Sequence, residues 1–524
     1  MAMAENEELS HECVGLVPRP RHVRASVSPS GPDTLDLSPG IELRHPATLS
    51  GPAGLLRDLL ADLGVGVGPV PVTVALDESI PTTVEPDHAH GLTGPAPDPK
   101  VDREAYRLVI TPDHVTLSAA QEAGILAGIA TLAQLTALAV TAPARESPAT
   151  PSSPAGSGPV LPAVDIDDAP RFAWRGLSLD VARHFFTADE VVEVLGLMFD
   201  LRLNVLHLHL TDDQGWRLAL ASRPELTQRS SGSAVGGGPG GYFTSEDYAR
   251  IQEAAARRGI TVVPEIDVPG HTNAALHAVP ELNPSGVAPE VYTGIEVGFS
   301  RLDPTLPATG PFLRDVFADL GAMTAGPWIH IGGDEPPEMD RAEYARLVEA
   351  AAREVVAAGK AVVAWQEAAR ASLPPGSVVQ FWKEDEPTED VVAAIDAGAR
   401  LLLSPATRVY LDMKYRPGFE LGLEWAGHTE LREAYEWDPA GALPGVREED
   451  IVGIEAAVFT ETLTTREDLL VMLLPRLAAV AEAAWTPQSG RDWPAFATRV
   501  GALARVWERG GLVWYRSLGV EWDQ

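Results

Sequence analysis

From about residue 172 onward, the chain alternates short apolar runs with longer segments in which apolar residues recur at helical spacing. Eight of the apolar runs have the length and composition of buried strands, at residues 175–181, 204–210, 261–266, 328–331, 361–365, 378–382, 400–403 and 452–459. The segments between them have the pattern of amphipathic helices, among them 188–201, 246–257, 342–357, 389–397 and 467–484. Strands that alternate with helices form parallel sheets, and eight such units predict a closed (β/α)8 TIM barrel, an α/β fold.

The segment before the barrel has a different pattern. Residues 106–118 predict a β-hairpin, because apolar side chains alternate on both sides of a Pro112-Asp113 turn. Residues 121–138 then show helical periodicity, and a stretch rich in Pro, Ser, Ala and Gly follows as an expected loop. We therefore expect a disordered tail at 1–14, a smaller α+β domain at 15–165 with this loop near its end, and the barrel with a C-terminal helix at 166–524.

The composition narrows the possible partners. The formal net charge is −34, from 40 basic and 74 acidic side chains, which argues against binding to nucleic acid or to an anionic membrane surface. The sequence contains no uninterrupted apolar run of about 18 residues, so it predicts no membrane span. We expect an uncharged small-molecule or oligosaccharide substrate, no cofactor, and a monomer or a homodimer.

The first residues bear on location and redox chemistry. They are acidic and lack the basic region and apolar region of a secretory signal, so the expected location is the cytoplasm. The single cysteine, Cys13, excludes an intramolecular disulfide framework and a thiolate metal cluster.

The string His330-Ile-Gly-Gly-Asp334-Glu335 carries the most chemistry in the chain. It places two adjacent carboxylates after an apolar run, and its two glycines let the backbone pass close to a ligand. The C-terminal ends of barrel strands are where such barrels hold their active sites. A pair of acids there suits acid-assisted cleavage of a glycosidic bond, because one acid donates a proton while the other stabilises the developing positive charge. The alternative interpretation is a strand followed by a solvated acidic turn.

Charged residues also follow the first three predicted strands. Arg183 follows the first, and its planar fork of donors suits two adjacent sugar hydroxyls, although a structural ion pair is the alternative. Asp212 follows the second in an Asp-Asp-Gln-Gly-Trp string, which is typical either of a sugar site or of a capped turn. His271 ends the string after the third, where a neighbouring carboxylate would hold its tautomer and charge.

Aromatic residues follow the later strands. The C–H face of a pyranose ring stacks on aromatic walls, so residues in these positions indicate a sugar-binding mouth when several occur together. The candidates are Trp365, Trp382, Tyr410 and Trp425; Phe459 ends the eighth run, and Glu461 follows it.

Two histidines lie on one face of the second predicted strand. His207 and His209 alternate with Leu206, Leu208 and Leu210, which occupy the other face. A His-x-His pair on a barrel strand binds a metal in some hydrolases, which leaves a metal-dependent barrel hydrolase as a second hypothesis. We favour the interpretation that both imidazoles fill the barrel interior through hydrogen bonds, because no other strand end supplies a convincing set of further ligands.

Taken together, these strings resemble the β-N-acetylhexosaminidases of glycoside hydrolase family 20, bacterial members of actinobacterial type in particular. VARHFF, HLHLTDDQGWR, PEIDVPGHTNAAL, HIGGDE, YLDMKY and FTETL occur in the order of that family. The resemblance extends over the barrel and more loosely over the preceding α+β domain. It implies an exo-acting hydrolase that removes terminal β-linked N-acetylglucosamine or N-acetylgalactosamine with retention of configuration.

The resemblance also implies roles for individual residues. Glu335 is the expected general acid and base, and Asp334 is expected to receive the N–H of the 2-acetamido group. The carbonyl oxygen of that group would be the nucleophile and would form an oxazolinium intermediate, so the usual rules on carboxylate spacing do not apply. Tyr410 would donate a hydrogen bond to this carbonyl, while Asp212 and His271 would support Glu335.

For sugar binding, the resemblance implies a second group of residues. The ring hydroxyls would be held by Arg183, Asp412, Trp425 and Glu461, and the acetamido methyl would be enclosed by Trp365 and Trp382. Position 459 departs from the family, because Phe459 stands where a Trp is usual; the change keeps an apolar platform but removes the indole N–H. A Gly-rich insert at 230–241 could form a flexible lid, although we expect a disordered loop. A carbohydrate-binding relative that has lost its chemistry is the third hypothesis, and the intact Asp334-Glu335-Tyr410 set argues against it.

Overall fold

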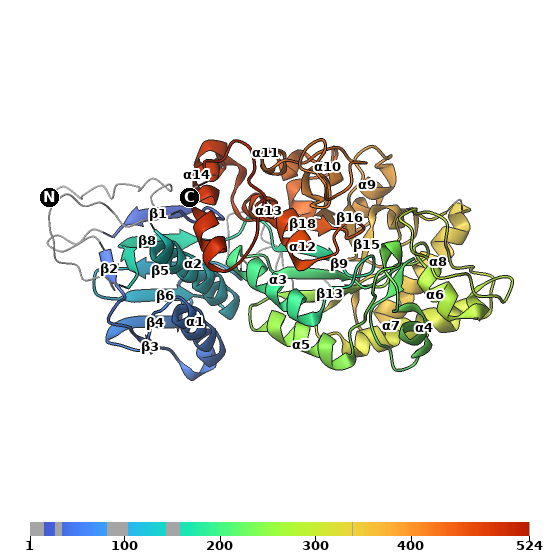
Figure 1. Cartoon of the computed structure of the whole chain (residues 1–524), viewed down its shortest axis with the longest axis horizontal. Helices are drawn as coiled ribbons and strands as arrows, with labels where there is room; N and C mark the ends of the chain where they lie inside the picture. The colour runs from blue at the N-terminus through green and yellow to red at the C-terminus, as the bar shows by residue number, and fades with distance from the viewer. Residues whose placement is uncertain (1–14, 27–33, 81–102, 143–157, 338, 523–524) are drawn as a thin grey trace.

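The computed structural model describes residues 15–26, 34–80, 103–142, 158–337 and 339–522. Two domains lie along the long axis of the molecule, a sheet with its helices at one end and a barrel at the other (Figure 1). The tail predicted at 1–14 and most of the loop predicted after the first domain, 143–157, fall outside the described residues.

The N-terminal domain is built on a mixed six-stranded sheet in the order β1-β8-β5-β6-β4-β3. The strands are β1 (His22–Ala25), β3 (Ile41–Arg44), β4 (Val70–Leu76), β5 (Tyr106–Ile110), β6 (Val115–Ala119) and β8 (Val164–Asp168), and a separate ribbon pairs β2 (Thr34–Asp36) with β7 (Val160–Pro162). The hairpin predicted at 106–118 is formed by β5 and β6, which pair antiparallel. Because β8 pairs with β1 and β5, this sheet extends to residue 168, and the boundary predicted at 165 falls inside one of its strands.

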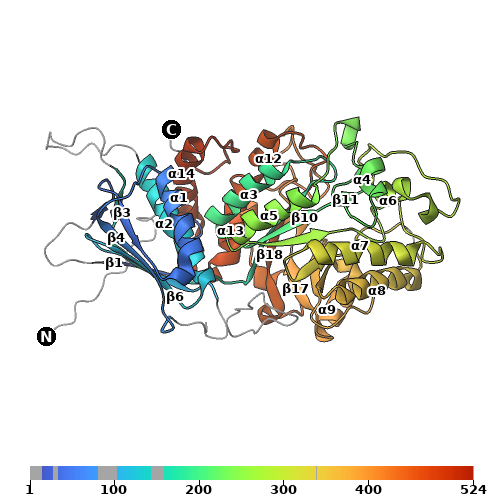
Figure 2. The ribbon, with the colours of Figure 1, turned by 90° about the horizontal axis from the view of Figure 1, so that it is seen from below.

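Helices α1 (Ser50–Asp62) and α2 (Glu122–Thr141) lie between this sheet and the barrel (Figure 2). By length and composition alone, α2 is apolar enough to cross a membrane, but 78% of its apolar window is buried inside the protein. It packs against β5, β6 and α1, and also against the barrel-domain helices α3 (Ala188–Asp200) and α14 (Trp493–Arg509). A helix that is apolar on all sides is expected in such a core position, and here it joins the two domains.

Eight parallel strands close the barrel in the order β9-β10-β13-β14-β15-β16-β17-β18, with β18 pairing to β9. They are β9 (Trp174–Asp180), β10 (Val205–His209), β13 (Thr261–Glu265), β14 (Trp328–His330), β15 (Ala361–Trp365), β16 (Val378–Phe381), β17 (Arg400–Leu403) and β18 (Ile451–Val458). Each lies within a residue or two of a predicted apolar run, so the predicted barrel is confirmed. A small ribbon of β11 (Thr211–Asp212) and β12 (Gly215–Trp216) follows β10.

The helices around the barrel follow the predicted periodicity with one exception. The longer ones are α3, α5 (Ser245–Ala256), α7 (Thr309–Met323), α8 (Arg341–Ala357), α9 (Glu389–Asp396), α12 (Arg466–Leu473), α13 (Arg476–Trp485) and α14; the short ones are α4 (Glu225–Ser230), α6 (Asn273–Ala278), α10 (Ala406–Val409) and α11 (Leu431–Tyr435). The barrel domain also has the 3-10 turns η3 (Val235–Gly237), η4 (Pro280–Leu282), η5 (Gln366–Arg370), η6 (Pro439–Gly441), η7 (Glu448–Asp450) and η8 (Gln488–Gly490), whereas η2 (Ala47–Leu49) belongs to the N-terminal domain. The single helix predicted at 467–484 is wrong, because Pro475, which has no N–H to donate, separates α12 from α13.

Three barrel helices begin with a capping box, which explains why they begin where they do. In α3, the Thr187 side chain accepts from the backbone N–H of Glu190, and the Glu190 side chain accepts from the backbone N–H of Thr187. Thr244 caps α5 and Thr465 caps α12 in the same reciprocal way. These contacts satisfy backbone donors that have no partner within the helix.

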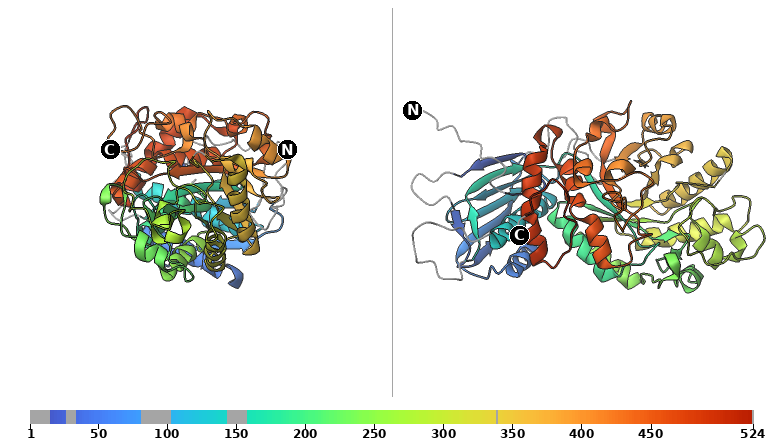
Figure 3. Two further views of the ribbon diagram at one scale, coloured as in Figure 1. Left: turned by 90° about the vertical axis from the view of Figure 1, so that its right-hand side faces the viewer. Right: turned by 45° about the horizontal axis from the view of Figure 1, so that its top comes forward.

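A buried ion pair ties the C-terminal helix to the rest of the chain. Arg499 of α14 donates two hydrogen bonds of 2.7 Å to the carboxylate of Glu482 on α13, and a third of 2.7 Å to the backbone oxygen of Leu16. The same carboxylate accepts from the backbone N–H of Arg19 and from the hydroxyl of Tyr435. Helix α14 therefore stands between the N-terminal domain and the barrel (Figure 3).

Removal of this cation should destabilise the fold strongly. Arg499→Met keeps most of the apolar stem but leaves the buried carboxylate of Glu482 without its counter-charge, which typically costs about 3–5 kcal/mol. We expect a clear drop in the urea midpoint and the thermal midpoint of unfolding. Arg341→Met is the matched control, because the pair between Arg341 and Asp390 is solvent-exposed and its loss should leave both midpoints unchanged. Equal shifts in the two variants would contradict this account.

Candidate active site

The turn after β14 has a left-handed backbone at three positions, two of which are glycines. Gly332 and Gly333 adopt φ values of 70° and 111°, and Glu335 has a φ of 39°, all in the left-handed region. A Cβ atom at Gly332 would lie 1.7 Å from Oδ1 of Asp267, so no other residue fits without displacing that side chain. The backbone N–H of Gly333 donates to the same oxygen at 3.0 Å. This turn places Asp334 and Glu335 at the barrel mouth, with side chains that are 15% and 31% exposed.

Asp212 and His271 connect this acidic pair to the barrel wall. Oδ1 of Asp212 lies 3.3 Å from Nδ1 of His271, and Nε2 of His271 lies 3.7 Å from Oδ2 of Asp334 and 3.8 Å from Oε2 of Glu335. Burial opposes protonation of His271, but Asp212 and Asp334 outweigh it and raise the pKa of the imidazole to about 10. A positively charged imidazolium therefore faces both acids, and four of the predicted catalytic residues lie together.

Arg183 lies at the same point but forms the ion pair that was its alternative interpretation. Its Nη2 lies 2.7 Å from Oδ2 of Asp212, and its Nη1 lies 3.6 Å from Asp180. Burial favours the neutral acid at Asp212, but Arg183 and His271 outweigh that effect and hold its pKa well below the usual range. A contact of Arg183 with sugar hydroxyls stays a prediction.

The predicted aromatic residues form one wall of the mouth. Trp382 stacks on Tyr410 with ring centroids 6.1 Å apart, and the edge of Trp425 meets both rings at 5.8 and 5.7 Å. Phe459 lies 5.5 Å from Tyr410 and 6.5 Å from Trp365, so all five belong to one cluster around the mouth. Trp365, Trp382 and Tyr410 are buried, whereas Trp425 is 51% exposed at the rim.

Several buried polar atoms of the predicted site residues have no hydrogen-bond partner in the described part of the protein. They include Oδ1 of Asp334, Oδ2 of Asp412, Oε2 of Glu461 and Nε2 of His271. Burial, with Glu461 as the second cause, raises the pKa of Asp412 to about 8. Buried polar groups normally have partners, so these atoms indicate the contacts that a polar ligand would complete.

Asp267 lies directly behind Asp334. Burial, followed by the charge of Asp267, raises the pKa of the Asp334 carboxyl well above its usual range, and the pKa of Asp267 is raised mainly by its own burial. Because the two carboxyl groups are buried next to each other, they do not both ionise easily. The pair therefore retains a proton to a higher pH than a free carboxyl group would.

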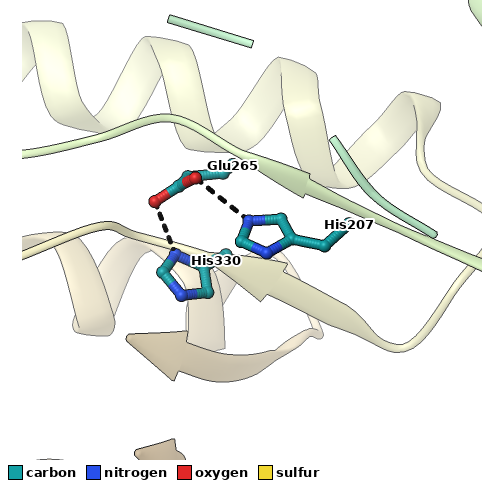
Figure 4. Close-up of side chains that lie close together, drawn as sticks. All are labelled: His207, Glu265 and His330. Carbon is teal, nitrogen blue, oxygen red and sulfur yellow. Dashed lines mark hydrogen bonds and ion pairs between the residues drawn. The ribbon is translucent and has the colours of Figure 1, made fainter. Parts of the chain in front are cut away.

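The two histidines of β10 lie inside the barrel and are held by carboxylates. His207 contacts Glu265 through Nε2 at 3.0 Å and Glu455 through Nδ1 at 2.9 Å. Nδ1 of His330 lies 2.9 Å from the other oxygen of Glu265 (Figure 4). These three side chains have the spacing of a metal-ligand set, but both ring nitrogens of His207 are already engaged by carboxylates. The hydrogen-bonded interpretation of His207 and His209 is therefore the one that the geometry supports.

The Gly-rich insert is an ordered loop, so the expectation of disorder is wrong. The fully buried guanidinium of Arg217 donates to the backbone oxygens of Ser231, Ser233 and Gly241 at 2.6 to 3.2 Å. Val235 N–H donates to the backbone oxygen of Arg183 at 3.0 Å. A buried cation with several acceptors fixes the path of this loop even though its sequence is rich in glycine.

Two further acids of the site were not predicted as functional. Glu265 accepts from Nε1 of Trp365 at 2.8 Å, and Glu367 accepts from Nε1 of Trp382 at 3.2 Å. Burial raises the pKa of Glu367 to about 7. Each acid lies at or just after the end of a predicted strand, and this position is the feature of the sequence that could have identified it. Neither acid, however, is next to a second acid in the sequence.

Comparison with known proteins agrees with this geometry. A family model described as "Glycosyl hydrolase family 20, catalytic domain" matches residues 172–343 and 338–488, and "Glycosyl hydrolase family 20, domain 2" matches 14–169. The chain belongs to glycoside hydrolase family 20.

Individual relatives of this family are similar over most of their length. The β-N-acetylhexosaminidase of Cellulomonas fimi is 55% identical over 419 residues, which are 80% of this chain and 82% of that protein. The solved structure of the Streptomyces plicatus N-acetyl-β-hexosaminidase in complex with thio-NAglucal has a TM-score of 0.84 at 39% identity, and covers 100% of this chain and 99% of that one. The family 20 enzyme of Streptomyces coelicolor has a TM-score of 0.83 at 39% identity, with coverage of 99% and 100%.

The activity of the chain follows from its family. It is an exo-acting glycoside hydrolase that removes terminal β-linked N-acetylhexosamine with retention, by substrate-assisted catalysis. The family 20 barrel thus provides both the acids and the aromatic wall described above.

The close packing of Gly332 predicts that one added methyl group will strongly reduce catalytic activity. Gly332→Ala should lower kcat/KM by about 100-fold or more, because a displacement of about 1 Å in a catalytic group costs that much. Gly359→Ala is the control: this glycine has a similar φ of 77° but open space around its Cβ position. Steady-state kinetics of the two variants decide the matter, and comparable activity in both would show that the turn tolerates the methyl.

Proposed function

We propose that Glu335 is the general acid and base of the reaction. Its side chain is the more exposed of the two acids at the mouth, and its carboxylate faces the His271 imidazolium at 3.8 Å. Such a position suits a group that first protonates the leaving oxygen and later removes a proton from water. The exposed side of Glu335 provides the path for that water.

Asp334 and Tyr410 are the proposed partners of the acetamido group. Asp334 has a free oxygen in the site and would accept the acetamido N–H. The phenol of Tyr410 is buried, and burial together with Asp334 raises its pKa well above the usual value. It therefore stays protonated and suits donation of a hydrogen bond to the acetamido carbonyl.

In this arrangement the substrate supplies its own nucleophile. With Trp365 and Trp382 around the methyl, the acetamido oxygen is held against the anomeric carbon, and well-oriented intramolecular attack is worth about 7–11 kcal/mol of the barrier. The positive charge that spreads into the amide is compensated by Asp334 and its neighbouring acids. Asp212 and His271 hold Glu335 in place, and Arg183, Asp412, Trp425 and Glu461 bind the ring, with Phe459 as an apolar platform.

The substrate class we propose is an uncharged oligosaccharide with a terminal β-linked N-acetylhexosamine, of the chito-oligosaccharide kind. The mouth combines apolar rings with acids, and cations other than His271 and Arg183 play no part in the proposed contacts. A polyanionic ligand is disfavoured by the net charge of −34. The cytoplasmic location and the monomeric or dimeric state stay predictions.

One assay separates the three hypotheses. The protein should hydrolyse an aryl β-N-acetylglucosaminide and be almost inactive on the matching aryl β-glucoside, with no change after treatment with a chelator. Equal rates on the two sugars would exclude assistance by the acetamido group. Loss of activity with the chelator would favour a metal site at His207 and His209, and inactivity on both sugars would indicate a binding protein.

The role of Glu335 predicts a dependence on the leaving group. Glu335→Gln should reduce kcat/KM by about 100-fold or more for a glycoside with a poor leaving group, which needs a proton. Hydrolysis of a dinitrophenyl glycoside, whose leaving group needs none, should suffer far less at the glycosylation step. A uniform loss across leaving groups, or no loss, would remove Glu335 from the acid role.

A further inference from the structure

A continuous chain of acids and imidazoles runs through the barrel interior to the mouth. In order, it consists of Glu455, His207, Glu265, His209, Asp212 and His271. All six side chains are at most 4% exposed. The proposed mechanism uses only the last two, so the deeper members have no assigned purpose.

His209 is the link between the deep part of this chain and the catalytic part. Its Nδ1 makes a short contact with Oε2 of Glu265, and its Nε2 lies 3.1 Å from Oδ2 of Asp212. A neutral imidazole has one donor and one acceptor, whereas both nitrogens here face carboxylate oxygens. Both contacts are satisfied together only when the ring carries two protons.

The charges around His209 support this protonation state. The carboxylates of Glu265 and Asp212 face the ring directly, and Asp267 lies nearby. Nη1 of Arg183 lies 3.4 Å from Nε2 and can only donate, so this contact suits a neutral ring; it is longer than the 3.1 Å contact with Asp212, which needs a proton on Nε2. Burial opposes the charged ring, but the two carboxylates outweigh burial and Arg183 and raise the pKa of His209 well above its usual value.

The contact between His209 and Asp212 matters for Glu335 because the same carboxylate of Asp212 also contacts His271. Oδ2 of Asp212 is shared by Arg183 at 2.7 Å and His209 at 3.1 Å, while Oδ1 faces His271 at 3.3 Å. His271 in turn faces Glu335. A shift of Asp212 would therefore move His271, and with it the group next to the proposed acid.

We propose that His209, as an imidazolium anchored on Glu265, is a positioning residue for proton donation: it fixes the carboxylate of Asp212 and thereby, through His271, the placement of Glu335. This inference rests on the proposed role of Glu335 and extends it to two buried residues to which the proposed function gives no contact with the substrate. Glu265 serves a second purpose in the same site, because its other oxygen accepts from Nε1 of Trp365.

The test uses His209→Gln in the full chain with a series of aryl β-N-acetylglucosaminides. Glutamine keeps a polar group but removes the charge and one of the two contacts. We expect kcat/KM to fall about tenfold or more for poor leaving groups and much less for a dinitrophenyl leaving group, since only the former need the placed proton. An equal loss for all leaving groups, or no loss, would overturn the proposal.

The pH profile gives a second readout with a defined sign. Loss of a buried positive charge makes the nearby acids harder to deprotonate, so the alkaline limb of kcat/KM should move to higher pH in His209→Gln. A limb that stays in place or moves to lower pH would contradict the proposal.

His207→Gln is the matched control. His207 is as deeply buried as His209 and contacts the same carboxylate of Glu265, but it faces Glu455 rather than Asp212. Glu265 and Glu455 outweigh burial and raise the pKa of His207 to about 9, so this variant also loses a buried charge, but one that does not contact Asp212. Its thermal midpoint is expected to fall and its alkaline limb to move less than that of His209→Gln, while its leaving-group dependence stays that of the parent. If both variants changed these two readouts alike, the role of His209 would be merely structural and the proposal would fail.

A measurement on the unmodified enzyme covers the case in which His209→Gln does not fold. In protein labelled with ¹⁵N and ¹³C in histidine, the side-chain signals of His209, assigned through correlations with its backbone, should show two protonated nitrogens from pH 5 to pH 8. A neutral ring within this range would overturn the proposal. Failure of the proposed function itself would look different, because the unmodified enzyme would then fail to hydrolyse the N-acetylglucosaminides.

Discussion

The carboxylate of Glu265 is the group on which the architecture of the site depends. It is fully buried at the end of β13, and its two oxygens contact His207, His209, His330 and Trp365, which come from three other strands. A buried carboxylate is stable only when donors surround it, so these four side chains must converge at one depth of the barrel. Convergence at that depth fixes both the indole that would enclose the acetamido methyl and the imidazole that supports Asp212. The wall of the acetamido pocket and the support of the general acid thus share one anchor.

The mouth above this anchor carries more acid than base. Asp334, Asp267, Asp412 and Glu461 have raised pKa values because they are buried close to one another, while Arg183 and His271 provide the compensating charge. Such an arrangement is costly when empty and becomes favourable when positive charge develops inside it. The intermediate of substrate-assisted hydrolysis is a cation that forms at this point. The electrostatic character of the site therefore suits the family chemistry better than it suits a permanently charged ligand.

The barrel could be predicted from the sequence because each strand is a distinct apolar run. A strand that is buried on both faces is apolar along its whole length, so it can be identified without knowing which strands it pairs with. The pair Asp334 and Glu335 could be predicted for a similar reason, since the two acids and the glycines that position them are adjacent in the chain. Glu265 could not, because it is one acid in an apolar strand and its four partners lie on other strands. The path of the insert at 230–241 could not be predicted either. Its glycine-rich composition indicates a flexible backbone, whereas its ordered path depends on hydrogen bonds from the buried guanidinium of Arg217. Pro475 was visible in the sequence, yet the apolar periodicity continues across it, and the break in the helix was missed.

The central claim is that the acetamido oxygen of the substrate performs the displacement. The most direct test is the rate of hydrolysis of aryl N-acetylglucosaminides in which the acetyl methyl carries one, two or three fluorine atoms, because each fluorine makes the carbonyl oxygen a poorer nucleophile while changing the size of the group little. The account predicts a steep, progressive fall in kcat/KM along the series. A rate that did not depend on the number of fluorine atoms would show that another group attacks the anomeric carbon.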